Sequence, residues 1–163
     1  MSAREHTALT VGLCFLVAVL EGFDIQAMGV AAPRLAPQFA LDASQMGWVF
    51  SISNIGLVIG ASFGGWLADR TGRKPVLMGA VAMFGCFTFA TAFAGDYHAL
   101  LAVRFFAGLG FGAALPNMMA IAAEISRPER AASTAAIMFC GMPVGGGLAA
   151  LTTQVLPLSL IHI

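Results

Sequence analysis

Residues 65–77 read GWLADRTGRKPVL, and this short polar stretch separates two long apolar segments. Gly72 permits a sharp bend of the backbone. Asp69 is expected to cap the helix that starts at the bend, and the bases of the stretch are Arg70, Arg73 and Lys74. The stretch therefore predicts a tight turn between two helices that run in opposite directions.

The apolar character extends over the whole chain of 163 residues, of which 59% are hydrophobic and 10% charged. Soluble domains carry roughly 25% charged residues, so this chain has too few charges to cover a surface that faces water. Nineteen glycines are also typical of closely packed membrane helices. Lys and Arg together number eight, as do Asp and Glu, so no basic field indicates a nucleic-acid partner. The composition predicts an integral protein of the lipid bilayer.

Hydropathy divides the chain into five predicted membrane spans, because about 20 residues suffice to cross the hydrocarbon layer. Asp42 and Ser44 are candidate N-caps of the second span. The last three connections are short, so consecutive spans are expected to form antiparallel hairpins. The predicted fold class is an all-α membrane protein with helices over residues 8–32, 45–68, 75–94, 99–123 and 131–155.

Basic residues set the predicted orientation, since loops on the cytoplasmic side are enriched in Lys and Arg. One side of the membrane receives Arg34 alone, while Arg104 lies inside a span. The N-terminus and the loops around 70–74 and 127–130 are therefore predicted to be cytoplasmic, in a multi-pass protein of the cell (inner) membrane. The bases on that side are Arg4, Arg70, Arg73, Lys74, Arg127 and Arg130.

Glu21 and Asp24 lie near the middle of the first span. Three residues on a helix correspond to 300° of rotation and 4.5 Å of rise, so the two side chains share a face. A charge at mid-membrane costs about 2.5–3.5 kcal/mol even on lenient scales. The two acids therefore require a partner, a proton or a water-filled cavity. A proton-binding site is the functional interpretation, and a structural pair satisfied by Arg104 or by other helices is the alternative.

Arg104 lies five residues into the fourth span. Its side chain could extend along the lipid-facing surface to the outer interface, or face the interior and hold a carboxylate in bidentate fashion. Pro116 and Asn117 follow in the same span and are expected to mark a local break in helical hydrogen bonding, where the amide faces a cavity.

Small residues recur every four positions in three of the spans, which predicts helix faces that approach closely. The sequence GLGFG in the fourth span follows no strand and is not a dinucleotide fingerprint. Cys14, Cys86 and Cys140 lie far apart and show no metal-ligand spacing, so neither a metal site nor a disulfide framework is predicted. The helix-packing glycines are Gly56, Gly60, Gly64, Gly108, Gly112, Gly141 and Gly145.

Three stretches together resemble the major facilitator superfamily. The order of residues from Gly65 to Leu77 is similar to the signature loop between its second and third helices. RFFAGLGFGAALPN in the fourth span and EISRPER before the fifth resemble further motifs of the superfamily.

The sequence EGFDIQAMGVAAP resembles the first helix of aromatic acid:proton symporters such as 4-hydroxybenzoate transporters. That helix commonly carries DGFD, so Glu21 is a conservative departure and Asp24 a match. LPN at residues 115–117 also resembles that subfamily. MFCGMPVGGGLAA resembles both that subfamily and a motif of drug:proton antiporters.

The resemblance implies a secondary transporter with two six-helix halves and a substrate site between them. It implies uptake of an aromatic carboxylate with a proton as coupling ion, no other cofactor, and no enzymatic activity. Asp24 with Glu21 would couple the proton and sense the substrate. Arg104 would bind the carboxylate or modulate the acids, and Asn117 would belong to the same region. The implied cytoplasmic gate consists of Gly65, Asp69, Arg70, Gly72, Arg73 and Lys74.

Five spans are fewer than half of the helices in such a transporter, so the chain is expected to be an N-terminal fragment that lacks the C-terminal half and is inactive alone. Residues 1–157 would form this partial half. LSLIHI at 158–163 does not continue the pattern, resembles translated adapter sequence, and is expected to be non-native. Two alternatives stay open. One is a proton-linked porter of another solute, such as a different organic acid, a sugar or a drug, and the other is a small non-transporting membrane-interaction protein.

Overall fold

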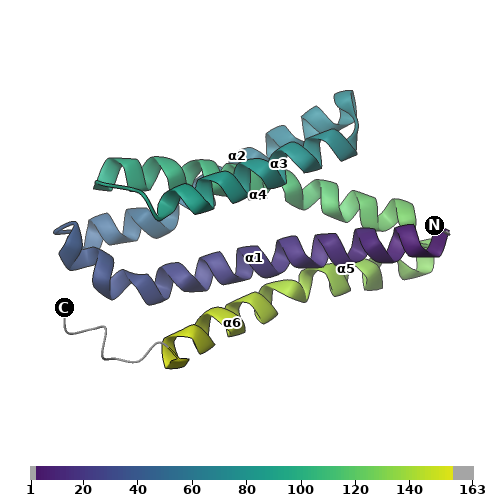
Figure 1. Cartoon of the computed structure of the whole chain (residues 1–163). Coiled ribbons are helices and arrows are strands. Elements are labelled where there is room, and N and C mark those ends of the chain that lie inside the picture. Colours follow the sequence, from purple (N-terminus) through teal and green to yellow (C-terminus); the bar gives the residue numbers. More distant parts are fainter. Residues whose placement is uncertain (1–2, 156–163) are drawn as a thin grey trace. The chain divides into compact units, whose positions relative to one another are not determined.

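The computed structural model describes residues 3–155, and within this range the backbone consists of helices joined by short turns, without strands (Figure 1). The predicted tail at 158–163 lies outside the described residues. The elements in chain order are α1 (Ala3–Gln38), α2 (Ala43–Thr71), α3 (Arg73–Thr91), α4 (Tyr97–Ile125), the 3₁₀ turn η1 (Pro128–Arg130), α5 (Ala131–Phe139) and α6 (Gly141–Val155).

Five helical segments of the described chain are long and apolar enough to cross a membrane, which confirms the all-α membrane fold class. Each segment contains most of one predicted span. The segments are Glu5–Gln38, Ala43–Thr71, Arg73–Thr91, Tyr97–Ile125 and Pro128–Thr152.

The first helix is longer than predicted, because α1 continues to Gln38 through Pro33 and Pro37. The prediction ended this span at residue 32 and treated the prolines as part of a loop. Each proline removes one backbone N–H donor, but a membrane helix tolerates such a loss where neighbouring groups satisfy the freed carbonyl. Pro37 also lies in the last turn of the helix, where there is little helix left to disrupt.

The fifth span is divided, whereas the prediction was one helix over 131–155. Helix α5 ends at Phe139, Cys140 forms a turn, and α6 begins at Gly141. The Cys140 N–H still donates to the carbonyl of Ala136 at 2.9 Å. Pro143 has no N–H to donate to the carbonyl of Phe139 four residues earlier, and glycine is a weak helix former. Gly141 and Pro143 together account for the interruption.

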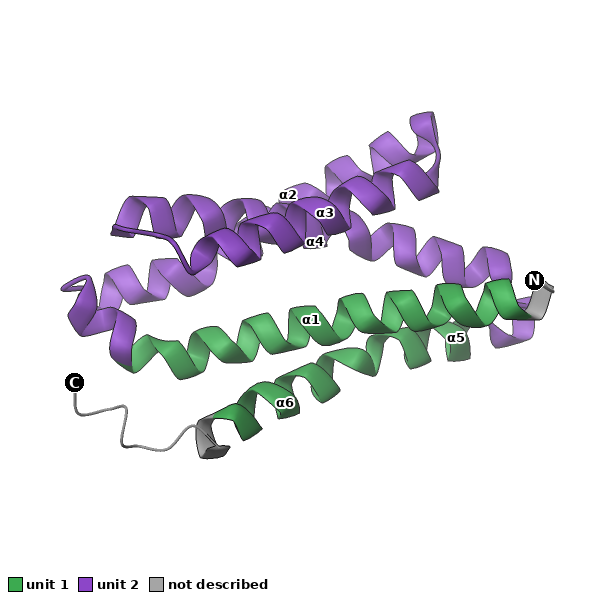
Figure 2. Cartoon of the chain, viewed as in Figure 1, with its two compact units in different colours: residues 1–33, 132–163 green, residues 34–131 purple. Residues whose placement is uncertain are grey.

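The chain forms two compact units, coloured separately in Figure 2. The unit of residues 34–131 contains α2, α3 and α4, and α4 packs against both of the other helices. Gly56 and Gly60 face the α4 backbone at Phe105 and Leu109, so closely that an added Cβ would overlap a carbonyl oxygen. The approach is reciprocal, because Gly108 and Gly112 face the α2 backbone.

The other unit, residues 1–33 and 132–163, contains most of α1 together with α5 and α6. Gly141 and Gly145 of α6 lie against the α1 backbone at Phe15 and Val19. Gly22 of α1 in turn faces the backbone of Met142. The small-residue pattern thus produced close backbone contact in both units, as the spacing predicted.

The helix starts follow local capping chemistry. The carboxylate of Asp42 accepts a hydrogen bond from the Gln45 N–H at 2.7 Å, and the Gln45 side chain accepts one from the Asp42 N–H at 3.0 Å. This reciprocal pair is a capping box, so Asp42 is the cap and Ser44 lies in the first turn. The carboxylate of Asp96 caps α4 by accepting a single hydrogen bond from the Ala99 N–H at 2.8 Å.

Candidate functional site: the turn between α2 and α3 and the charged groups of α1 and α4

The signature turn consists of a single residue between two helices. Gly72 has a φ of 95°, in the region that side-chain-bearing residues rarely adopt, and its N–H closes α2 by donating to the Ala68 carbonyl. The capping role expected of Asp69 is wrong. Asp69 lies inside α2, and the residue before α3 is Gly72, which has no side chain with which to cap the helix. The reversal is too tight to leave Asp69 outside the preceding helix.

An ion pair closes the turn against the far end of α4. Arg73 Nε lies 2.7 Å from Glu124 Oε1, and both side chains are partly exposed, at 39% and 59%. Arg73 is in the first turn of α3 and Glu124 in the last turn of α4. A polar hollow of about 470 Å³ surrounds this pair, lined by Ala68, Asp69, Gly72, Arg73, Lys74, Ile121 and Glu124.

Arg70 takes a different direction from Arg73. Its guanidinium carbon lies 4.1 Å from the centroid of the Trp66 ring, which is a cation–π distance. Gly65, also part of the motif, meets nothing within 4 Å at the position of a Cβ, so its face of α2 is open within the described structure.

Glu124 is the residue of this site that the sequence interpretation did not assign. It stands at the start of EISRPER, which was interpreted only as a motif that precedes the fifth span. The sequence does contain a signal for this pairing, because the acidic residue of that motif is predicted on the same side of the membrane as the bases of the turn.

The two acids of the first span lie on one continuous helix, as predicted. Glu21 is 7% exposed and Asp24 is half-buried. The unbroken α1 backbone keeps the rotation of about 300° between them, so both carboxyls lie on neighbouring positions of one face. A buried carboxyl of this kind is costly as an anion in an apolar environment, and such residues are functional candidates in membrane helices.

Arg104 and Asn117 are both buried on α4, at 4% and 1% exposed. The burial of Arg104 argues against a side chain that extends along a lipid-facing surface. The Asn117 side-chain nitrogen donates to the carbonyl of Ala113 at 2.8 Å, and α4 continues through Pro116 without interruption. The helix is therefore not interrupted at Pro116, although the proline still lacks the N–H that would donate to the carbonyl of Gly112. Thirteen residues separate Arg104 from Asn117, about 20 Å along the helix, so α4 does not bring them together.

The acids belong to one compact unit and Arg104 to the other. Among residues 3–155, no group of three or more His, Cys, Asp or Glu side chains has a geometry that could hold a metal ion. What the described residues present is a charged turn with an ion pair, two acids on one apolar helix, and a buried guanidinium on another.

This combination of five apolar helices, glycine-packed interfaces and a charged α2–α3 turn defines a polytopic membrane protein. The sequence pattern of the Major Facilitator Superfamily matches residues 14–160, and the chain belongs to this family.

Its relatives include transporters of aromatic acids. The chain is 50% identical over 149 residues to a 3-(3-hydroxy-phenyl)propionate transporter of Escherichia coli, covering 91% of the chain and 37% of that protein. It is 46% identical over 134 residues to a 4-hydroxybenzoate transporter of Pseudomonas putida (82% of the chain, 30% of that protein). It is 39% identical over 140 residues to a gallate transporter of the same species (86% and 31%). The chain thus spans about a third of the length of the curated relatives it matches.

Proposed function

We propose that this chain provides the first five membrane helices of a secondary transporter that takes up an aromatic carboxylate together with a proton. The observation that carries the proposal is the 50% identity to a transporter of a hydroxyphenyl-substituted acid, which extends over 91% of the chain. Hydroxybenzoate and gallate transporters among the other relatives favour the same class of substrate.

The charged groups of the spans suit this chemistry. A carboxylate substrate needs a cationic partner at membrane depth, and the planar guanidinium of Arg104 offers two parallel donors to it. Glu21 and Asp24 are acids in an apolar helix, and taking up a proton removes the cost of a buried charge. A loaded and protonated carrier would then change between its outward-open and inward-open states more easily than a carrier with a bare carboxylate.

The ion pair between Arg73 and Glu124 supports a gating role for the α2–α3 turn in the same transporter. It joins the beginning of α3 to the end of α4 at one end of the helices. Six of the seven bases outside the spans would share the cytoplasmic side in the proposed orientation, in the inner membrane of a bacterial cell.

An uptake assay on the full-length transporter that contains this sequence tests the proposal. Cells that express it are supplied with radiolabelled 3-(3-hydroxyphenyl)propionate, 4-hydroxybenzoate or gallate, and separately with a sugar and a cationic drug. We expect uptake of at least one aromatic acid, reduced by a protonophore. Uptake of only the sugar or the drug would contradict the substrate class, and uptake unaffected by the protonophore would contradict proton coupling.

A further inference from the structure

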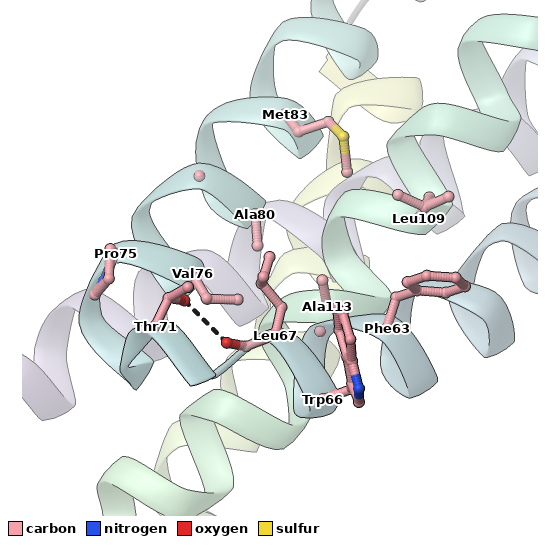
Figure 3. Close-up of a pocket in the computed structure, with 13 residues that line it drawn as sticks. Phe63, Trp66, Leu67, Thr71, Pro75, Val76, Ala80, Met83, Leu109 and Ala113 are labelled. Carbon is pink, nitrogen blue, oxygen red and sulfur yellow. Dashed lines mark hydrogen bonds between the residues drawn. The ribbon is translucent and has the colours of Figure 1, made fainter. Parts of the chain in front are cut away.

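An apolar groove lies beside the charged turn, on the helices α2, α3 and α4 (Figure 3). Its volume is about 410 Å³, which is within the range of clefts that hold small ligands. Phe63, Trp66 and Leu67 come from α2, while Val76, Ala80 and Met83 come from α3 (Figure 3). The base of the groove is formed by Leu109 and Ala113 of α4.

One of the lining glycines, Gly79 of α3, borders open space. A Cβ placed at Gly79 would meet no atom within 4 Å. Two lining side chains, those of Thr71 and Trp66, have a polar atom. The Thr71 hydroxyl donates to the carbonyl of Leu67 at 2.9 Å. The groove therefore has an apolar lining, suited to a hydrocarbon chain and not to a polar solute.

The charged turn lies at one end of this groove. Thr71 and Pro75 line that end, and they flank the turn that contains Arg73 and Lys74. Arg73 is paired with Glu124. Within residues 3–155, neither Arg70 nor Lys74 forms an ion pair, and both side chains are exposed. Asp69 lines the polar hollow beside the turn, together with Arg73, Lys74 and Glu124. The turn and Glu124 together have three bases and two acids.

Trp66 connects the apolar and the charged parts. The residue is 51% exposed, and its ring makes an edge contact with Phe63 and lies under the Arg70 guanidinium. Tryptophan is enriched at the level of the lipid headgroups, where one part of the ring is apolar and the other meets water. Trp66 therefore indicates that the charged end of the groove lies at the membrane interface.

We propose that this groove binds one acyl chain of an anionic phospholipid, with Arg70 and Lys74 contacting the headgroup phosphate. The hydrocarbon would pack between Leu67 and Ala80, and the headgroup would lie beside the turn. A second protein helix would match the apolar part equally well, but it would pair with the two cations only if it carried acidic groups at the same level. An anionic phospholipid meets both requirements, because its acyl chain is apolar and its headgroup attracts bases near the membrane surface.

Quenching of Trp66 fluorescence tests the proposal directly. The chain contains two tryptophans, so Trp48→Phe leaves Trp66 as the only indole. The purified variant is reconstituted in phosphatidylcholine bilayers that contain increasing fractions of phosphatidylglycerol with brominated acyl chains. The same series with brominated phosphatidylcholine is the reference. We expect phosphatidylglycerol to quench at lower mole fractions than phosphatidylcholine does.

Charge variants separate a specific site from a general attraction. In the Trp48→Phe background, Lys74→Gln should lower the preference for phosphatidylglycerol about fivefold, the factor that corresponds to about 1 kcal/mol for one base. Arg127→Gln removes a base that is outside the groove and should leave the preference unchanged. Equal losses in the two variants would overturn the proposed site, as would equal quenching by the two lipids.

Filling the groove provides a second test that does not depend on charge. Gly79→Leu places a side chain in the hollow without meeting a neighbouring atom at its Cβ, and it should reduce quenching by both lipids. Gly85→Leu is the matched control, because it lies on the same helix in open space and outside the groove. Circular dichroism confirms that both variants stay helical. If neither lipid quenches Trp66 before Gly79 is changed, the groove is covered by protein and the proposal is wrong.

Discussion

Arg73 Nε and Glu124 Oε1 lie 2.7 Å apart and join the first turn of α3 to the last turn of α4. The two residues are far apart in the sequence, so the contact depends on the packing of α3 against α4. It is the point where the signature turn meets the motif that precedes the fifth span. Its position at the helix ends allows it to respond to a movement of either helix.

The ion pair should contribute little to stability, since both side chains are partly exposed and such pairs are worth roughly 0.2–1 kcal/mol. Glu124→Gln should therefore lower the free energy of unfolding by less than about 1 kcal/mol. A double-mutant cycle with Arg73→Gln isolates the coupling, measured by detergent-induced unfolding with circular dichroism. Glu129→Gln removes a nearby exposed acid as a control. A coupling energy above about 2 kcal/mol would contradict the assignment of an exposed pair.

Gly60 should be intolerant of any side chain, because an added Cβ would overlap the Leu109 carbonyl on α4. Gly60→Ala is expected to destabilise the unit of α2, α3 and α4 by about 1–3 kcal/mol, the cost of overpacking. Gly47→Ala is the matched control, since it lies on the same helix and its Cβ would meet nothing within 4 Å. Its higher helix propensity should make it neutral or stabilising. Equal destabilisation by both variants in the same unfolding assay would refute the close-packing argument.

Asp24→Asn should abolish proton-coupled uptake in the full-length transporter, because an amide cannot take up and release a proton. The substitution removes a charge from an apolar helix, so membrane insertion should be unchanged. Uptake of the aromatic acid in cells and the amount of protein in the membrane fraction are the two measurements. Glu5→Gln is the control, as it neutralises an acid in the first turn of the same helix. Near-normal uptake by the Asp24 variant would contradict the proton-coupling role.

The sequence was sufficient for the features that depend on local periodicity. Apolar runs predicted the five spans, and glycines every four residues predicted faces of close approach. The partners of those faces, α4 for Gly60 and α1 for Gly145, come from the structure. Gly72 was predicted to allow the bend, and its φ of 95° confirms this.

Features that depend on packing were less accessible. The division of the fifth span at Cys140 was not predicted, because several spans contain glycines and prolines. Helix propensity alone does not tell that the helix is interrupted near Pro143 but continues through Pro116. The Arg73–Glu124 pair required the register of α3 against α4. Asp69 resembled a cap because its distance from the turn fits one, but a single-residue reversal places it in the preceding helix.

Arg104→Lys should weaken binding of an aromatic carboxylate to the full-length transporter about tenfold. A lysine keeps the positive charge but not the planar pair of donors, and losing one hydrogen bond to a charged group costs about 1.5 kcal/mol. Arg104 is 4% exposed, so the shorter reach of an ammonium cannot be offset by water. Binding is measured by titration of the purified protein with 4-hydroxybenzoate. Arg34→Lys is the control, because it makes the same substitution at an exposed arginine. If the affinity of the Arg104 variant is unchanged, the guanidinium does not hold the substrate, and its burial has a structural cause within the helices.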